Sequence, residues 1–305
     1  MSEALDVYKA LADESRLRLL HVLSKGSFNV QELTTVLKVS QSTISHHLKV
    51  LQAVNLASAQ KEGTWVYYTL PQNDPNSFVH QTAQLFLANT KQSAADIQLA
   101  GDIVNRRRDQ TRHFFDSVAK NWKELRETQG TESFFDIVKE RIPSNAAFLE
   151  LGCGSGPFLD KIVPRSGMTV GVDYSQGMLD EARRTLGSRA SQVDLRLGYL
   201  EHLPIGDDSI DVALVYMVLH HLPTPVDALK DACRVLKPGG QLLIVDLVRH
   251  DNEYMRERYA DLWLGFDPEE MKRWASSSGF ADAKVEILGH KKEVFLLTTR
   301  KKEEA

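Results

Sequence analysis

The stretch AFLELGCGSG, residues 147–156, decides the fold of the larger part of this chain. It begins as an apolar run with a single acid, which predicts a buried strand. The run ends in Gly152, Gly154 and Gly156, and glycines at this spacing allow a sharp turn into a helix and let a ligand lie against the backbone. The next apolar run ends at Asp173, where a carboxylate can accept hydrogen bonds from both hydroxyls of a ribose. The loop and the acid together predict a nucleoside site in an α/β domain.

Two downstream stretches separate this domain from the dinucleotide dehydrogenases, which use a similar glycine loop. LPIGDDSIDVALVYMVLHHL (203–222) and ACRVLKPGGQLLIVD (232–246) resemble the fourth and fifth strand regions of class I S-adenosylmethionine-dependent methyltransferases. The resemblance extends from about residue 114 to 300. It implies a Rossmann-like α/β fold with a mostly parallel seven-stranded sheet, and S-adenosylmethionine or S-adenosylhomocysteine as the ligand rather than a nicotinamide.

The resemblance also implies ligand contacts. Glu150, Gly152 and Gly154 would line the amino-acid end of the ligand, and Asp173 would bind the ribose. Tyr174 and Met178 would flank the adenine, and Tyr216 and His220 would lie near the sulfur.

The segment GYLEHLP, residues 198–204, departs from the family pattern. The family commonly has an acid after the glycine, to meet the adenine amine, and Tyr199 stands there in this chain. Backbone groups near Leu200, or the side chain of Glu201, would then take over the contact.

Catalysis has fewer candidates than ligand binding. Methyl transfer needs a nucleophile held in line, and oxygen or nitrogen acceptors can also need a base. His220 and His221 are the only paired candidates near the expected pocket, and the alternative is that they belong to the family scaffold. Only residues 248–266 are available to build a lid or an acceptor surface, so the acceptor side looks sparse. The remaining aromatic candidates, which would be either core or a lid over the nucleoside, are Phe114, Phe115 and Trp122.

Cys153 and Cys233 are the only cysteines, and they lie far apart in stretches that read as buried scaffold. A disulfide framework is therefore not expected, and no Cys/His cluster has the spacing of metal ligands. We expect no bound metal. Arsenic methylation would need further thiolates.

The first 72 residues carry a second set of local signals. Asp13 is placed to cap a helix, Asn29 with Glu32 has the spacing of a capping box, and Ser40 opens a third helix. In that third helix the residues Ile44, Leu48 and Leu51 recur at helical spacing, which predicts one buried face and one small polar outer face. Two strand-like runs within residues 57–70 predict a β-hairpin wing with its turn at residues 61–64. Such an arrangement suits the major groove of DNA.

The stretches LADESRLRLLHVL (11–23), ELTTVLKVSQSTISHHLKVLQ (32–52) and EGTWVYYTL (62–70) resemble the ArsR/SmtB winged helix-turn-helix family. The resemblance implies an α+β DNA-binding domain in which Lys61 or Thr64 grips the DNA backbone. The expected contacts in the third helix are Ser40, Gln41, Ser42, Thr43, Ser45, His46 and Lys49. Metal-sensing members have cysteines in the preceding helix, and this chain has none there. The alternative is a small helical bundle with a hairpin that serves as a partner interface.

The three predicted segments are the DNA-binding domain (1–72), a helical dimerisation connector (73–113) and the methyltransferase-like domain (114–305). A two-fold homodimer would read a roughly palindromic operator. The run Arg106–Arg108 is more typical of a solvated helix face than of a DNA contact.

The composition limits the remaining function classes. The chain has 305 residues and a formal net charge of −4, which excludes a globally basic DNA-coating protein. The start of the chain does not have the pattern of a signal peptide, and no apolar run has the length of a membrane span, so a cytoplasmic protein without membrane contact is expected.

The fusion of the two domains resembles S-adenosylhomocysteine-responsive repressors of the methionine and methyl cycle. The leading hypothesis is therefore a DNA-binding transcriptional regulator, a repressor, that senses S-adenosylhomocysteine or S-adenosylmethionine. The alternatives are an active small-molecule methyltransferase that controls its own operon, and a metal or arsenic sensor.

Overall fold

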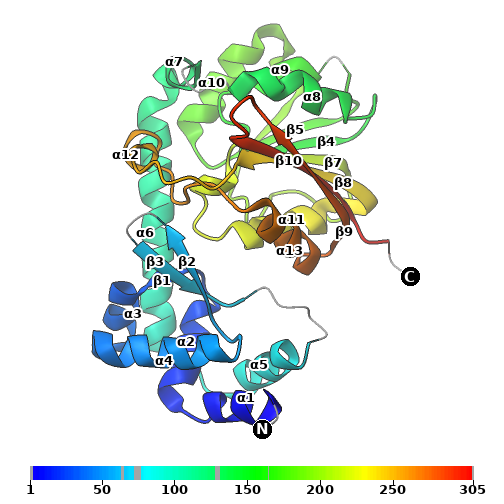
Figure 1. Cartoon of the computed structure of the whole chain (residues 1–305). Coiled ribbons are helices and arrows are strands. Elements are labelled where there is room, and N and C mark those ends of the chain that lie inside the picture. The colour runs from blue at the N-terminus through cyan, green and yellow to red at the C-terminus, as the bar shows by residue number, and fades with distance from the viewer. Residues whose placement is uncertain (1–2, 63–64, 72–76, 128–130, 164, 304–305) are drawn as a thin grey trace. The chain divides into compact units, whose positions relative to one another are not determined.

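The structure is a computed structural model that describes residues 3–62, 65–71, 77–127, 131–163 and 165–303 (Figure 1). The chain divides into two compact units. The first consists of Met1–Asp109 with Asp251–Glu253, and the second of Gln110–His250 with Tyr254–Ala305. Among the described residues, no helix combines the length and the apolarity that crossing a bilayer requires.

The first unit is a winged helix. Its elements are α1 (Glu3–Leu11), α2 (Glu14–Leu23), β1 (Phe28–Asn29), α3 (Val30–Leu37), α4 (Gln41–Ala53), β2 (Ser58–Glu62), β3 (Trp65–Thr69), α5 (Phe78–Asn89) and the beginning of α6 (Ala94–Val118). The predicted helix starts are confirmed. Asp13 accepts a hydrogen bond from the amide of Arg16, and Ser40 accepts one from the amide of Thr43. Asn29 and Glu32 form the reciprocal capping box.

The wing is a three-stranded antiparallel sheet in the order β1-β3-β2. The hairpin of β2 and β3 was expected, but β1 was not, because a strand of two residues has no periodicity to detect. Phe28 of β1 pairs with Tyr68 of β3, forty residues later in the chain. Two residues of the expected turn, Gly63 and Thr64, lie outside the described residues.

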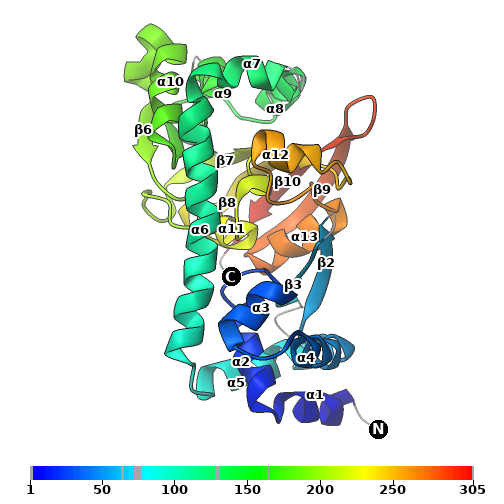
Figure 2. The same cartoon turned by 90° about the vertical axis from the view of Figure 1, so that its left-hand side faces the viewer.

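The helices of the expected connector contribute to the core of the first unit. Val79 of α5 and Ala100 and Val104 of α6 are buried in one cluster with the α2, α3 and α4 side chains. Helix α6 starts in the first unit and ends in the second, and it is continuous over its 25 residues (Figure 2).

The second unit contains a seven-stranded sheet in the order β6-β5-β4-β7-β8-β10-β9, in which only β10 runs antiparallel to its neighbours. The mostly parallel seven-stranded sheet was predicted, and it is confirmed. The strands are β4 (Phe148–Leu151), β5 (Thr169–Asp173), β6 (Asp194–Leu197), β7 (Ile210–Tyr216), β8 (Leu236–Leu247), β9 (Phe280–Leu288) and β10 (Val294–Lys301).

Helices cover both faces of this sheet, as Figure 1 shows for α8 and α9 on one face and α11 and α13 on the other. The α-helices are α7 (Trp122–Glu127), α8 (Phe135–Glu140), α9 (Pro157–Ile162), α10 (Gln176–Leu186), α11 (Pro225–Val235), α12 (Tyr254–Tyr259) and α13 (Pro268–Ser277). The short 3-10 helices are η1 (Ala119–Asn121), η2 (Thr131–Phe134), η3 (Gly187–Gln192) and η4 (Leu219–His221). Successive residues of β4 enter different cores, Phe148 on one face and Leu149 on the other, because strand side chains alternate. The sheet is therefore buried on both faces.

Candidate functional site

The glycine loop follows β4 and turns into α9, as the sequence predicted. Gly152, Gly154 and Gly156 all have positive φ, between 51° and 72°, a region that favours glycine. A Cβ at Gly152 would overlap the side chain of Val218, so this glycine is required for packing. A Cβ at Gly154 would meet no heavy atom within 4 Å, so Gly154 leaves open space beside the loop.

Asp173, the last residue of β5, closes the other side of the loop. Its Oδ2 accepts a hydrogen bond from the amide of Gly154 at 2.9 Å, and its Oδ1 accepts one from the amide of Ser175 at 2.9 Å. Burial raises the pKa of Asp173 to about 6, although these amide hydrogen bonds favour the ionised form. The amide of Tyr174 also favours the ionised form, and because an ionised carboxylate has about four acceptor positions, at least one remains for a ligand.

A cavity with about 870 Å³ of empty space, including the part open to solvent, lies at this edge of the sheet. The residues singled out from the sequence that line it are Glu150, Gly152, Gly154, Asp173, Tyr174, Met178, Tyr216, His220 and His221. The hydroxyl of Tyr174 is buried, and among the described residues it has no hydrogen-bond partner.

Three residues expected near the adenine are not part of the described lining. Tyr199 is 38% exposed, Leu200 is buried in the hydrophobic core on one face of the sheet, and the buried Glu201 accepts a hydrogen bond from the hydroxyl of Thr224 at 3.4 Å. Their adenine contacts stay predictions.

Aromatic rings cover part of the cavity. Phe115, at the end of α6, lies edge-on to Trp122 with ring centroids 5.2 Å apart, and edge-on to His221 at 4.8 Å. Phe115 and Trp122 both line the cavity, whereas Phe114 is not in the lining and packs against Phe115. Phe115 and Trp122 also pack in a small core cluster with Met178, so the position of these two rings fits both interpretations, core and lid.

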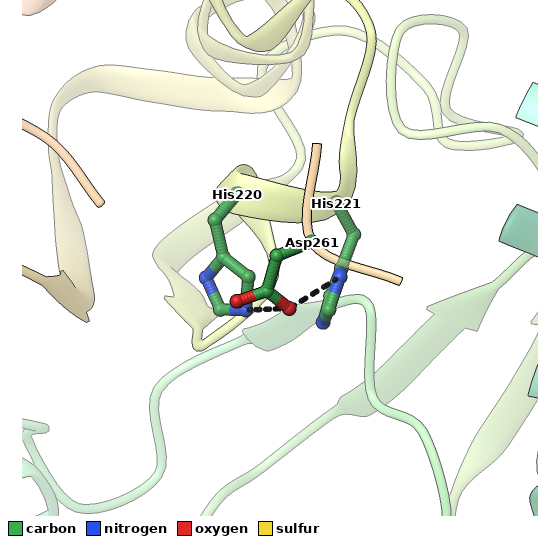
Figure 3. A group of neighbouring side chains, drawn as sticks. All are labelled: His220, His221 and Asp261. Atoms are coloured by element: carbon green, nitrogen blue, oxygen red, sulfur yellow. Dashed lines mark ion pairs between the residues drawn. The ribbon is translucent and has the colours of Figure 1, made fainter. Parts of the chain in front are cut away.

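His220 and His221 from η4 and the carboxylate of Asp261 face one another, and all three residues line the cavity (Figure 3). A second aspartate, Asp246, lies behind His220. Nδ1 of His220 lies 2.6 Å from Oδ1 of Asp246, the acid near the end of β8. The other ring nitrogen, Nε2, lies 3.8 Å from Oδ1 of Asp261, and Nδ1 of His221 lies 3.5 Å from the same oxygen. The side chains of all four residues are nearly inaccessible to solvent.

The pKa values of the two histidines are shifted in opposite directions. Burial opposes the charged form of His220, but the carboxylates of Asp246 and Asp261 outweigh it and raise its pKa to about 9. Burial, together with the charge of His220, lowers the pKa of His221 well below its usual value. Burial raises the pKa of Asp261 to about 6, against the effect of the His220 charge.

Sequence reasoning missed Asp246, Tyr259 and Asp261 as site residues. Tyr259 and Asp261 lie within the stretch 248–266 that was recognised as the available lid, but its folding could not be read from the sequence. Asp246 had a usable signal, because it is an acid near the carboxyl end of a buried strand, where ligand sites of open α/β sheets lie.

Cys153 also lines the cavity, and burial raises its thiol pKa well above the usual value, so it is a neutral group.

The first unit presents the predicted polar face of α4. Ile44, Leu48 and Leu51 are buried. The candidate contacts Ser40, Gln41, Ser42, His46 and Lys49 are exposed, and Thr43 and Ser45 are half-buried. Lys61 is exposed on the wing, and Thr64 lies outside the described residues.

Arg107 differs from the solvated helix face expected for residues 106–108. It donates a hydrogen bond to the carbonyl of Ser27 at 2.8 Å and forms an ion pair with Glu32. Its guanidinium lies 5.2 Å from the ring centroid of Tyr67 in the wing. Arg107 therefore connects α6 to the capping box of α3 and to β3, whereas its neighbour Arg106 is exposed. Sequence reasoning could not find this contact because its partners are distant in the chain.

Both halves of the chain match known families. Residues 13–59 match the family described as bacterial regulatory protein, arsR family, and residues 149–244 match the family described as methyltransferase domain.

The similar proteins fall into the same two groups. The arsenical resistance operon repressor of Bacillus subtilis is 39% identical over 75 residues, which are 24% of this chain and 71% of the repressor. A demethylmenaquinone methyltransferase of Lactobacillus johnsonii is 31% identical over 180 residues, 56% of this chain and 70% of that enzyme. An uncharacterized 37.1 kDa protein in transposon TN4556 of Streptomyces fradiae is 38% identical over 127 residues, 40% of this chain, and the match spans only 36% of that protein's length.

Solved structures agree with the fold of the second unit. One chain of the complex between the Haloferax volcanii Trm112 methyltransferase activator and a methyltransferase has a TM-score of 0.55 at 16% identity, with 62% of this chain and 98% of that chain covered. A SAM-dependent methyltransferase of Thermotoga maritima has a TM-score of 0.51 at 24% identity, with 63% and 100% covered. At these identities the likeness concerns the fold alone.

Proposed function

We propose, from the premise that this chain belongs both to the arsR family of bacterial regulatory proteins and to the methyltransferases, that it is a transcriptional regulator controlled by a nucleoside. In this proposal the first unit binds operator DNA as part of a homodimer. The second unit binds S-adenosylmethionine or S-adenosylhomocysteine, and the bound nucleoside changes the affinity for DNA.

The nucleoside proposal rests on the hydrogen bonding of the Asp173 carboxylate. Its two oxygens accept amide hydrogen bonds from Gly154 and Ser175, and the carboxylate retains acceptor capacity that suits a ribose hydroxyl. The unpartnered hydroxyl of Tyr174 and the open space at Gly154 also fit a polar ligand that lies against the loop. S-adenosylmethionine would supply an activated methyl group on a sulfonium, and aromatic residues such as Phe115 and Trp122 in the lining suit a cation.

Helix α6 supports the regulatory part of the proposal. Near its end, Phe115 lines the cavity, and Asp116 accepts a hydrogen bond from the hydroxyl of Ser175 at 2.6 Å, two residues after Asp173. Two turns earlier, Arg107 contacts the helix that precedes α4. A nucleoside that binds two conformations unequally at one end of α6 would change the population of DNA-competent molecules.

A homodimer is supported by exposed apolar side chains on two contacting helices, α1 and α5. Tyr8 of α1 is 48% exposed and Leu85 of α5 is 62% exposed, and Tyr8 lies edge-on to Phe78 of α5. A second copy covering this face would remove these side chains from water. Sedimentation analysis of the chain and of Leu85→Glu tests this, and the substituted chain is expected to be monomeric.

The central experiment measures the nucleoside and the DNA together. Calorimetry with S-adenosylhomocysteine and with S-adenosylmethionine determines which ligand binds, and operator titration is then repeated with each ligand at saturation. We expect the operator affinity to change by about 5-fold to 150-fold, the usual range of allosteric coupling. A nucleoside that binds while leaving the operator affinity unchanged would disprove the regulatory proposal and leave the nucleoside site intact.

A second candidate function, methyl transfer to a small molecule, is favoured by the pair of His220 and Asp246. A histidine held by a buried carboxylate at the wall of a nucleoside cavity is suited to general acid–base catalysis, and its raised pKa of about 9 means that its base form predominates only at alkaline pH. Turnover of labelled S-adenosylmethionine with a metabolite extract tests this function. Methyl transfer that is lost in His220→Gln, with nucleoside binding retained, would support an enzyme.

A further inference from the structure

We propose that His220, His221 and Asp261 form a binding site for one divalent transition-metal ion, such as Zn²⁺ or Co²⁺, at the wall of the nucleoside cavity. The inference goes beyond the proposed nucleoside site and does not depend on it, because the metal would bind to protein atoms alone. It also departs from the expectation, drawn from the cysteine pattern, that no metal binds.

The three side chains offer donor atoms at suitable separations. One oxygen of Asp261 lies 3.8 Å from Nε2 of His220 and 3.5 Å from Nδ1 of His221, which also lies 3.4 Å from the carbonyl oxygen of Ala260. One ligand atom from each of the three residues lies within 4.8 Å of the other two (Figure 3). These distances are too long for good hydrogen bonds. Donors bound to a tetrahedral metal at about 2.0 to 2.2 Å are about 3.3 to 3.6 Å apart. A contraction of the cluster, in which Nδ1 of His221 loses its proton and its contact with the carbonyl of Ala260, would therefore complete three metal bonds.

Asp246 holds His220 in the tautomer that metal binding needs. The Asp246 carboxylate accepts hydrogen bonds from the amides of Leu219 and Leu247 at 3.0 and 2.7 Å, and Nδ1 of His220 lies 2.6 Å from its Oδ1. Because the carboxylate is an acceptor, Nδ1 carries the proton, and the lone pair of neutral His220 is on Nε2, the atom that faces Asp261. A carboxylate behind a histidine is the usual outer shell of a metal site.

Asp261 itself lacks the hydrogen bonds that a buried carboxylate normally has. It is 3% exposed, and neither of its oxygens accepts a hydrogen bond from the part of the chain that the structure describes. Such a group is costly to bury unless a cation neutralises it. A metal bound between the two histidines would supply that charge directly.

The donor set indicates the class of ion and its chemistry. Two imidazoles and one carboxylate suit zinc, iron, cobalt or nickel better than magnesium or calcium, which prefer oxygen donors. Three protein ligands leave at least one coordination position open, and the three residues all line the cavity. An oxygen, nitrogen or sulfur atom of a small molecule in the cavity could occupy that position.

Cobalt titration of the full chain tests the site. After treatment with a chelator, the protein is titrated with Co²⁺ alone and its visible absorption is recorded, because cobalt in a low-symmetry site absorbs strongly. We expect ligand-field bands that saturate at one Co²⁺ per chain and that disappear when Zn²⁺ is added. Asp261→Asn and His221→Ala should abolish the bands, and Asp246→Asn, which changes a positioning residue, should weaken Co²⁺ binding about 10-fold to 100-fold.

His290→Ala is the matched control, because His290 is an exposed histidine of the same unit and should leave the titration unchanged. Circular dichroism and thermal unfolding report whether each variant folds. Asp261→Asn, which preserves the shape of the side chain, decides the result if His221→Ala does not fold. The proposal is overturned if the unsubstituted chain shows no saturable bands, or if folded Asp261→Asn retains them.

Discussion

At the scale of single residues, Asp173 and the His220 cluster show which side chains a sequence can identify. The position of Asp173 at the cavity was predictable because it ends a buried strand at a fixed distance from a glycine loop, and its role as a ribose ligand stays a prediction. The partners of His220 were not, because Asp246 and Asp261 follow it by 26 and 41 positions in the chain. Only the sheet, which sets β7 beside β8, and the path of residues 248–266 bring them together.

The raised pKa of Asp173 predicts how nucleoside binding depends on pH. An ionised carboxylate can accept both ribose hydroxyls, and its pKa of about 6 means that it becomes protonated below that pH. We expect the affinity for S-adenosylhomocysteine to be about tenfold lower at pH 5 than at pH 7.5. Calorimetry across this range measures the change.

The ionisation of Asp173 affects the stability of the fold in the opposite direction from its effect on nucleoside affinity. The folded protein holds a proton on Asp173 more tightly than the unfolded chain does, so this group stabilises the fold below its ordinary pKa of 3.8, and the contribution is lost as the pH rises through about 6. Asp261→Asn is the control, because Asp261 titrates in the same range. A pH dependence that vanishes in Asp261→Asn would assign the effect to Asp261 instead of Asp173.

At the scale of elements, the helix starts of the first unit were predictable because a cap is a local contact. Asp13, Ser40 and the pair of Asn29 and Glu32 each act within three residues. Strand β1 was missed because its two residues are recognisable as a strand only through their pairing with β3. Local chemistry therefore sets where helices begin, and the sheet partners depend on distant residues.

The glycine loop gives a paired prediction. Gly154→Ala adds a methyl group into open space beside the cavity, so we expect weaker nucleoside binding with a loss of stability of about 1 kcal/mol from the positive φ. Gly152→Ala has the same backbone cost and also overlaps Val218, so its melting temperature should fall further. Thermal unfolding and calorimetry of both variants measure the difference. Equal melting temperatures would remove the packing role of Gly152.

Helix α4 gives a prediction about DNA. Lys49 is exposed on the polar face of this helix, and a lysine that neutralises one phosphate releases about one counterion. Lys49→Ala should therefore weaken operator binding and reduce the slope of log K against log salt by about 1. Lys91→Ala, an exposed lysine outside α4, is the control. An unchanged slope in Lys49→Ala would exclude Lys49 from the phosphate contacts.

At the scale of the whole molecule, the two units share one element, because α6 contributes core residues to the first and cavity residues to the second. Between Asp102 and Val118 the helix contains neither glycine nor proline, so nothing in its sequence predicts a break there. The proposed regulation therefore assigns α6 the role of linking the nucleoside site to the first unit. In that proposal, the contact of Arg107 with Ser27 and Glu32 is the place within the first unit where a nucleoside signal would act on the DNA-binding helices.

Arg107→Lys tests this coupling. Lysine keeps the charge but cannot donate two hydrogen bonds in a planar fork or stack on Tyr67 in the same way. We expect the nucleoside affinity, measured by calorimetry, to stay the same. The ratio of operator affinities with and without the nucleoside should shrink by about fivefold or more, a change within the usual range of coupling. Arg106→Lys, at the exposed neighbouring position, should behave as the unsubstituted chain. If folded Arg107→Lys keeps the full ratio, then the nucleoside signal does not pass through this contact, and the regulatory proposal would need another route along or outside α6.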